Sequence, residues 1–502
     1  MPKKSKRSAK EIDLTDEQRM IVNAKINECD CVLINAYAGT GKTSTLRKLA
    51  EALSDRRVLY ICFNRETALH AKKYFPKNTD CRTIHSLAFS LIGGVYREKI
   101  GILRPLDIMR KLKLSKSYLA VFTIQGVERF LYSIDEQIQT KHMPVEASTC
   151  GINLDELVNC SRVLWELMQD KNSAVPMTHD GYLKIWAKTN PKLAAYDFIF
   201  LDESQDTNPV TLDVVMRQRL HKTTGLVFVG DTHQSIYSFR GSINAMEKLQ
   251  EISTLKYTLT KSFRFNNEIA TDASSILTHF KGDMVNLIGA GPTLSPNGES
   301  IIIGRTNTEV IDQAILASSK GHMIHFTGTN EGDNWDPYVP YALQIPLDIL
   351  SLKQDAPRDI KSSHIRAFSS YEELVEHSKG GDSRVGADLE LAKQVSLVEK
   401  YGVDLPQVIS IIRKNSSPPD SASMTFSTSH RSKGGEWRSV QLLDDFFKLD
   451  GLSDDEIHRI KESTELTEEI NLIYVAMTRA AELNTYNSDL NKWLTNGRNV
   501  RN

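Results

Sequence analysis

The chain of 502 residues is too long for one hydrophobic core, so we expect several domains. A net charge of -1 excludes a basic field over the whole surface, so any nucleic-acid interface must be a local groove. The six cysteines form no C-x-x-C pair and no Cys–His cluster, which argues against a zinc site or a disulfide framework.

The N-terminal segment, MPKKSKRSAK, is basic and contains no acidic residue. Residues 1–13 therefore form a basic arm, which could be a nuclear import signal, an arm that touches phosphate, or a solvated tail. No apolar run approaches the roughly 18–20 residues of a membrane span. We expect no membrane partner and an intracellular location, nuclear in a eukaryote and otherwise cytoplasmic or at the nucleoid.

The first chemically informative segment is INAYAGTGKTSTLRKLA, residues 34–50. An apolar run before it is typical of a buried strand, and the residues after it repeat apolar side chains at helical spacing. Gly39 and Gly41 would allow backbone N–H groups to surround phosphate oxygens at the start of the helix. Lys42 would reach the terminal phosphates and Thr43 a magnesium ion.

This segment departs from the pattern G-x-x-x-x-G-K-[ST] at one position, because Ala36 replaces the first glycine. The alternative is an ordinary glycine-rich turn between strand and helix. The flanking strand and helix are those that the phosphate-binding motif requires, so we favour a nucleoside triphosphate as the ligand.

Further apolar runs follow along the chain, with helical patterns between them. This alternation predicts a parallel α/β fold. Two long stretches, about residues 95–190 and 321–422, are mostly helical or irregular, and we expect them to be insertions. The strand-like runs span residues 58–63, 198–202, 225–231, 300–306 and 439–445.

The second chemical signal is FIFLDESQD, where an apolar run ends in acidic side chains. A carboxylate at the carboxyl end of a strand can hold magnesium through its water shell, and the next acid can polarise an attacking water. We therefore assign Asp202 to the metal and Glu203 to the general base. Alone, such a cluster is as often a turn or a helix start, but its occurrence together with the Lys42 loop favours the catalytic role.

Eight segments resemble, in the same order, the motif set of superfamily 1 DNA helicases of the UvrD/Rep type. The stretch MTHDGYLKIW, residues 177–186, further resembles the helicase region of the F-box DNA helicases. Since thirteen residues precede Leu14, we expect no F-box and no ubiquitin-ligase adaptor role. The eight segments are LTDEQ (14–18), the Lys42 loop, RTIHSLA (82–88), FIFLDESQD (198–206), VGDTHQSIYSFRG (229–241), LTKSFRF (259–265), STSHRSKGGEW (427–437) and NLIYVAMTRA (471–480).

The resemblance implies two RecA-like P-loop domains with parallel sheets, each carrying a mainly helical inserted subdomain. ATP would lie in the cleft between the domains, and single-stranded DNA would cross their top. The implied ranges are 14–95 and 190–265 for the first RecA-like domain (1A), 96–189 for its insertion (1B), 266–320 and 423–502 for the second RecA-like domain (2A), and 321–422 for its insertion (2B).

The same resemblance implies roles around ATP. Gln18 would select the adenine, Gln234 would sense the γ-phosphate, and Glu436 would contact the ribose. Arg264 and Arg479 would approach from the far side of the cleft and stabilise the charge that develops in phosphoryl transfer. The remaining ATP-site residues are Ala38, Gly39, Thr40, Gly41, Lys42, Thr43 and Ser44, with Thr43 and Asp202 as magnesium ligands and Lys42, Asp202 and Glu203 in catalysis.

Aromatic side chains among the implied DNA contacts can stack on any base, which suits movement without sequence preference. Phe63 and Tyr237 could instead be core residues. The segment SIYSFRG is harder to explain as core, because its aromatics and Arg240 would expose rings and a cation together. The implied DNA-binding residues are Phe63, Asn64, Thr83, His85, Tyr237, Phe239, Arg240 and His430.

Together these signals predict an ATP-dependent DNA helicase or translocase with ATP and Mg²⁺ as cofactors. The resemblance implies 3′-to-5′ movement on single-stranded DNA, and unwinding or protein removal in DNA repair and recombination control. Partners would be single-stranded DNA, DNA junctions and recombination proteins on DNA. An alternative is an ATP-gated switch or clamp with little unwinding. An interaction module with a vestigial ATPase fits poorly, because Lys42, Asp202 and Glu203 are all present.

Overall fold

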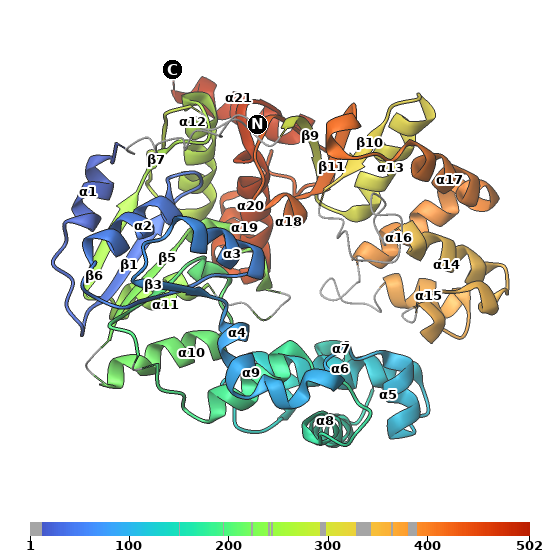
Figure 1. The fold of residues 1–502 in the computed structure, drawn as a ribbon. Coiled ribbons are helices and arrows are strands. Elements are labelled where there is room, and N and C mark those ends of the chain that lie inside the picture. The colour runs from blue at the N-terminus through green and yellow to red at the C-terminus, as the bar shows by residue number, and fades with distance from the viewer. Residues whose placement is uncertain are drawn as a thin grey trace, which may run out of the picture.

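A computed structural model describes most of the chain and gives the arrangement shown in Figure 1. Residues 1–12 of the predicted basic arm lie outside the described residues, as do Phe239 and Arg240. The described ranges are 13–149, 151–193, 195–221, 224–238, 241, 244–291, 298–327, 343–362, 365–379 and 389–501.

The first sheet has six parallel strands in the order β3-β2-β4-β5-β1-β6. Its central strands are buried on both faces and almost wholly apolar, so they form continuous hydrophobic runs in the sequence. The strands are β1 (Cys31–Ala36), β2 (Val58–Ile61), β3 (Thr79–Arg82), β4 (Phe198–Leu201), β5 (Gly225–Gly230) and β6 (Leu255–Leu259).

Helices cover both faces of this sheet. On one face, α1 (Asp16–Val22), α2 (Lys42–Ala52) and α3 (Arg65–Tyr74) bury apolar side chains against alternate strand residues. On the opposite face, α10 (Pro209–Arg217) and α11 (Ala245–Ile252) pack in the same way. The carboxyl ends of β1, β2 and β4 therefore lie along one edge, where the candidate site is found.

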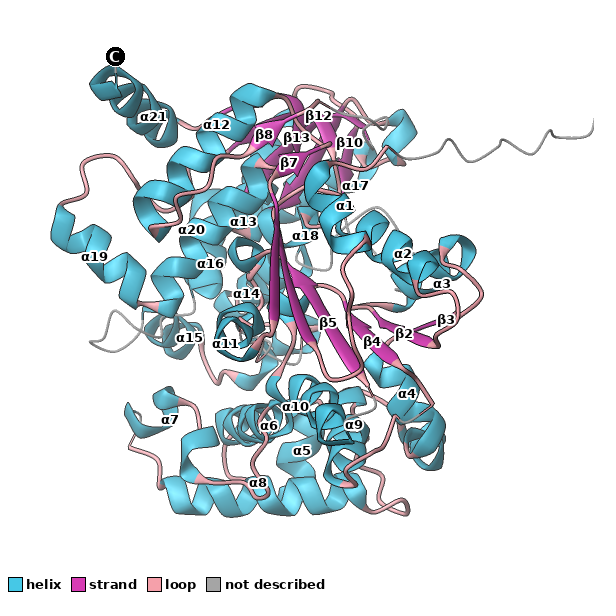
Figure 2. Ribbon diagram, turned by 90° about the vertical axis from the view of Figure 1, so that its left-hand side faces the viewer, coloured by secondary structure: helices cyan, strands magenta, loops and turns pink. Residues whose placement is uncertain are grey.

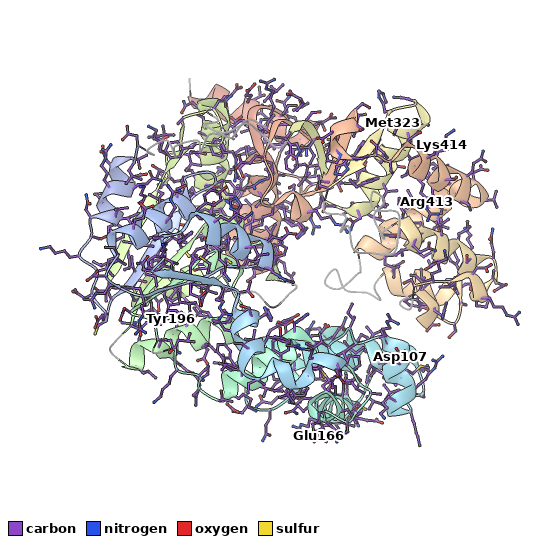
Figure 3. All side chains as sticks on the ribbon, viewed as in Figure 1. Asp107, Glu166, Tyr196, Met323, Arg413 and Lys414 are labelled. Atoms are coloured by element: carbon purple, nitrogen blue, oxygen red, sulfur yellow. The ribbon has the colours of Figure 1, made fainter. Side chains whose placement is uncertain are left out.

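Between β3 and β4 the described residues form a layer of helices beside the first sheet, as Figure 2 shows. Figure 3 labels Asp107 and Glu166 on this layer, and Tyr196 where the chain returns to the sheet. There the Tyr196 hydroxyl donates to Asp80 Oδ2 at 2.8 Å. The helices are α4 (Ile84–Leu91), α5 (Pro105–Leu112), α6 (Ser117–Tyr132), α7 (Val145–Thr149), α8 (Leu154–Gln169) and α9 (His179–Lys188).

A buried cation lies inside this helical layer. Lys184 is 2% exposed, and its Nζ donates to the backbone oxygens of Ser133 and Asp135 at 2.5 and 2.7 Å. The same Nζ lies 4.4 Å from the centre of the Phe130 ring. Burial lowers the pKa of Lys184 to about 8, with a smaller contribution from Lys188.

The second sheet is also parallel, in the order β10-β11-β9-β12-β13. The polar segment after Arg479 forms its edge strand, which faces only one neighbour and so tolerates polar side chains. β10 lies within the stretch 321–422 yet pairs with β11. The strands are β9 (Gly298–Gly304), β10 (Ile324–Phe326), β11 (Met424–Thr428), β12 (Trp437–Leu442) and β13 (Ala480–Thr485).

Two sets of helices enclose the second sheet. The first set shares its core with β9, β12 and the start of β13, and the second set shares the core that contains Phe326 and Phe426. The first consists of α12 (Asn267–Ile276), α19 (Asp454–Glu462), α20 (Thr464–Met477) and α21 (Ser488–Arg501). The second consists of α13 (Asn307–Ser319), α14 (Gln344–Lys353), α15 (Tyr371–Lys379), α16 (Leu389–Tyr401) and α17 (Leu405–Asn415). Arg413 and Lys414, which Figure 3 labels, lie on α17.

The chain crosses from the first sheet to the second through a short two-stranded sheet. β7 (Lys261–Ser262) pairs with β8 (Ile288–Gly289), and the Phe263 N–H donates to Gly39 O at 2.9 Å. Ile236 packs against α20 as a second contact between the two halves. The predicted α/β fold with parallel sheets is confirmed. Among the described residues, no helix has the length and apolarity needed to cross a bilayer.

Candidate nucleotide site and nucleic-acid interface

The loop between β1 and α2 has the backbone that its glycines predict. Gly39 and Gly41 have φ angles of +73° and +81°, in the left-handed region that favours glycine. A Cβ on Gly39 would lie 2.5 Å from both Arg264 Cβ and Ser262 Oγ. Ala36 ends β1 and is fully buried. Glycine is therefore needed at position 39, where another segment lies directly against the loop.

Gln18 is buried and joins three segments. Its Oε1 accepts from Thr15 N at 3.0 Å in a capping box that starts α1. Its Nε2 donates to Thr40 O at 3.3 Å and to Thr45 Oγ1 at 3.1 Å. The implied recognition of adenine by Gln18 would therefore compete with bonds that hold α1 on the loop.

The other predicted loop residues surround the start of α2. Thr40 is buried, and its hydroxyl donates to Tyr37 O at 2.7 Å, which shapes the loop from within. Thr43 is exposed and Ser44 half-buried in the first turn, where helix N–H groups lack intrahelical partners. A phosphate and a hydrated cation both suit that position.

Lys42 and the acidic pair at the end of β4 lie close together. Lys42 Nζ lies 3.3 Å from Glu203 Oε2, and the Tyr60 hydroxyl donates to Asp202 Oδ2. Burial opposes the charge of Lys42, but the carboxylates around it raise its pKa. Burial also raises the pKa of Asp202 to about 6, and the charge of Glu203 adds to this.

Glu203 remains ionised in this cluster. Burial opposes its charge, but Lys42 and Lys433 outweigh that effect and lower its pKa. Its φ of +51° is uncommon outside glycine and turns the chain sharply after β4. Gln205 Nε2 donates to Glu203 Oε2 at 2.6 Å. Such backbone conformations are found preferentially at functional sites, where neighbouring contacts hold them.

A hydrogen-bond network behind the loop joins the two halves of the molecule. Gln234 Nε2 donates to Asp231 Oδ2 at 2.7 Å, and the Tyr474 hydroxyl of α20 donates to the same oxygen at 3.1 Å. The Ala38 N–H in turn donates to the Tyr474 hydroxyl at 3.2 Å. The N–H of Ala38, a predicted ATP-site residue, is thus engaged by the second half.

The two predicted arginines come from different segments: Arg264 from the segment that connects the two halves, and Arg479 from the second half. Arg264 Nε donates to Glu436 Oε1 at 2.8 Å, and its side chain contacts the loop through the close approach at Gly39. Arg479 is 1% exposed, and its Nε donates to Val475 O at 2.9 Å. Burial lowers the pKa of Arg479 to about 9, and the neighbouring Arg264 adds to this. Arg479 is thus held by the end of the preceding helix α20, while Arg264 is paired with the predicted ribose contact.

Three predicted DNA contacts form a row of rings between the halves. The Phe63 and Tyr237 rings are stacked with centroids 5.9 Å apart and planes 11° apart. The His430 ring lies 6.1 Å from Tyr237, whose hydroxyl donates to His430 O at 3.2 Å. Phe63 is 49% exposed, which excludes the alternative that it is a core residue.

Other predicted DNA contacts have local structural partners. Asn64 and Thr83 are the N-caps of α3 and α4, and their side chains accept from Thr67 N and Ser86 N at 2.8 and 3.1 Å. His85 Nε2 lies 3.1 Å from Asp180 Oδ1. His85 thus contacts α9, in the stretch 177–186 that lies outside the general helicase motifs.

Several site residues were not predicted from the sequence. The Tyr37 hydroxyl and His233 Nε2 lie 2.5 and 2.7 Å from the same oxygen of Asp283, so the loop, the segment after β5 and the segment after α12 meet there. Tyr37 and His233 are also stacked at 5.8 Å. His233 and Tyr474 lie inside helicase-like motif segments, but no spacing rule indicates that they join two halves of the chain.

Known proteins are similar to this chain over much of its length. A family model described as an AAA domain matches residues 18–240. F-box DNA helicase 1 of Gallus gallus is 33% identical over 94% of this chain and 49% of its own length. F-box DNA helicase protein 1 of Schizosaccharomyces pombe is 30% identical over 95% of this chain and 58% of its own length. A probable DNA helicase II homolog of Mycoplasma capricolum is 23% identical over 62% of this chain and 47% of its own length. The chain thus spans about half the length of these relatives.

Proposed function

The chain belongs to the UvrD/Rep-type superfamily 1 helicases, and we propose that it is an ATP-hydrolysing DNA helicase that moves along single-stranded DNA. One observation carries the proposal. The Lys42 loop, the acids after β4 and Arg264, from the segment that connects the two halves, meet at one point. A site at the connection between two halves can use the chemistry of ATP to change how the halves sit together.

The residues present suit ATP and magnesium. The left-handed glycines and the start of α2 suit phosphate oxygens, and Lys42 supplies a compact positive charge. Thr43 and Asp202 would hold the magnesium, which usually retains several waters and needs few protein ligands. ATP supplies the free energy of phosphoryl transfer. Glu203, ionised beside Lys42, would orient the attacking water and accept its proton.

The row formed by Phe63, Tyr237 and His430 supports single-stranded DNA as the substrate. Bases stack on aromatic rings without regard to sequence, so a strand could advance past such rings one step at a time. We extend the proposal to 3′-to-5′ movement and to unwinding or protein removal in DNA repair and recombination, acting on junctions and on recombination proteins. A nuclear location in a eukaryote belongs to the same proposal.

The domain division is also proposed. The ranges 14–95 with 190–265 and 266–320 with 423–502 would form the two RecA-like domains, with 96–189 and 321–422 as insertions. The pairing of β10 with β11 supports a later start for the second insertion, after residue 326.

The test combines ATP hydrolysis with strand displacement on duplexes that carry a 3′ or a 5′ single-stranded tail. We expect hydrolysis stimulated by single-stranded DNA and displacement from the 3′-tailed duplex. Lys42→Ala should reduce hydrolysis by on the order of 100-fold or more. The same variant is the control for a contaminating ATPase, whose activity would remain in its preparation. DNA-stimulated hydrolysis without displacement from either duplex would instead support the ATP-gated clamp.

A further inference from the structure

Lys433 connects the second half of the molecule to the hydrolytic centre of the first. It follows the short helix α18 (Ser429–Ser432), and its Nζ lies 2.5 Å from Asp206 Oδ2 and 2.6 Å from Gln234 O. The two side chains are 10% and 3% exposed, so this ion pair is largely removed from water. Both acceptors come from the segments that follow β4 and β5.

The Asp206 carboxylate depends on this lysine. Its second oxygen, Oδ1, is buried without a hydrogen-bond partner among the described residues. Its other oxygen accepts from Lys433 and, at 3.2 Å, from Gln205 Nε2. A buried carboxylate with so few donors would be left uncompensated if the ammonium group were removed.

Lys433 also reaches both functional ends of the site. In one direction, Gln205 donates to both Asp206 and Glu203, so Lys433 is linked to the proposed base through two intervening side chains, Asp206 and Gln205. In the other direction, Lys433 Nζ lies 5.0 Å from the centre of the Tyr237 ring, which stacks on Phe63. One ammonium group therefore contacts the ring row and the acidic cluster together.

We propose that Lys433 is a positioning residue that transmits the state of the Phe63–Tyr237 ring pair to the Glu203 cluster, so that base stacking accelerates ATP hydrolysis. This inference rests on the proposed helicase function. A strand that displaces the Tyr237 ring would shift the ammonium, and through Asp206 and Gln205 it would shift the Glu203 carboxylate. Lys433 contacts neither ATP nor DNA in this scheme.

The test compares wild type with Lys433→Gln, Asp206→Asn and the double variant Lys433→Met with Asp206→Asn. Basal ATP hydrolysis, hydrolysis at saturating oligo(dT) and the melting temperature are measured for each. Lys448→Gln is the matched control, because Lys448 lies in the same half and its Nζ donates to the Asp444 backbone oxygen on the exposed surface. We expect Lys433→Gln to lower turnover at saturating oligo(dT) about tenfold more than it lowers basal turnover, a typical coupling strength.

The double variant separates coupling from a purely structural role, because it leaves no uncompensated buried charge. If its melting temperature recovers while the DNA stimulation stays low, the inference is supported. Recovery of both the melting temperature and the DNA stimulation would make the pair a structural contact and overturn the inference. An equal loss of basal and stimulated turnover in Lys433→Gln would also overturn it.

The wild type distinguishes this inference from the proposed function. If the wild type hydrolyses ATP with no response to DNA, the proposed function fails as well. If the wild type responds to DNA and Lys433→Gln responds equally, only the inference is overturned.

Discussion

Replacing Gly39 with alanine should show how much the close contact at the phosphate loop matters for ATP turnover, beyond the effect of backbone strain alone. The new Cβ would lie 2.5 Å from Arg264 Cβ, which is fixed to the backbone and cannot rotate away. Ordinary contacts of a Cβ begin at 3.4 Å, so the loop and the segment 262–264 must separate by about 1 Å. That displacement moves Lys42 relative to Arg264.

Gly451→Ala is the matched control. Gly451 has a φ of +81°, close to that of Gly39, but among the described residues no heavy atom lies within 4 Å of the position its Cβ would take. Both substitutions should therefore cost roughly 1–2 kcal/mol of folding free energy from backbone strain. Only Gly39→Ala adds a displacement at the site.

We expect Gly39→Ala to lower ATP turnover at saturating single-stranded DNA by about 100-fold, the loss that a 1 Å misplacement commonly causes. Gly451→Ala should remain close to wild type. Turnover and thermal unfolding are measured on all three proteins. Turnover of Gly39→Ala within about threefold of Gly451→Ala would refute the argument that this contact sets the catalytic geometry.

Three further predictions address other parts of the molecule. Glu203→Gln should retain ATP binding, measured by a fluorescent nucleotide, but lose turnover by on the order of 100-fold because no carboxylate accepts the proton. Phe63→Ala should weaken oligonucleotide binding by about 5- to 150-fold in anisotropy titrations, with basal hydrolysis intact, because stacking contributes about 1–3 kcal/mol per base. Lys184 has a folded pKa of about 8 against an ordinary value of 10.5, so folding releases a proton between these pH values and stability should rise with pH across that window. Lys184→Met should flatten this rise, which amounts to at most about 3 kcal/mol, in melting curves recorded from about pH 7.5 to 10.5.

Much of the fold could be predicted because buried parallel strands are continuous apolar runs. β4 and β5 are buried at every residue and were therefore visible in the sequence. β10 was hidden, because three residues are too few to show a period and its place is set by pairing with β11.

The candidate site was predictable where one motif contains all the interacting groups. The loop glycines and Lys42 are an example. Contacts between distant segments were not, since Tyr474 reaches Ala38 across 436 positions of the chain. Asn64 and Thr83 are intermediate cases: each precedes a helix and has the side chain of an N-cap, so a structural role could have been predicted from the sequence.

The passage of the chain from the first sheet to the second has a mechanical consequence. In the described part of the chain, the strands of the first sheet precede residue 260 and those of the second follow residue 297, and the connecting segment bonds to Gly39 O at the phosphate loop. A rotation of the two halves about this connecting segment would therefore have its pivot beside the nucleotide loop. A small rotation there would be magnified with distance, as at the end of a lever arm, so the helical layers farthest from the loop would travel farthest for each ATP consumed.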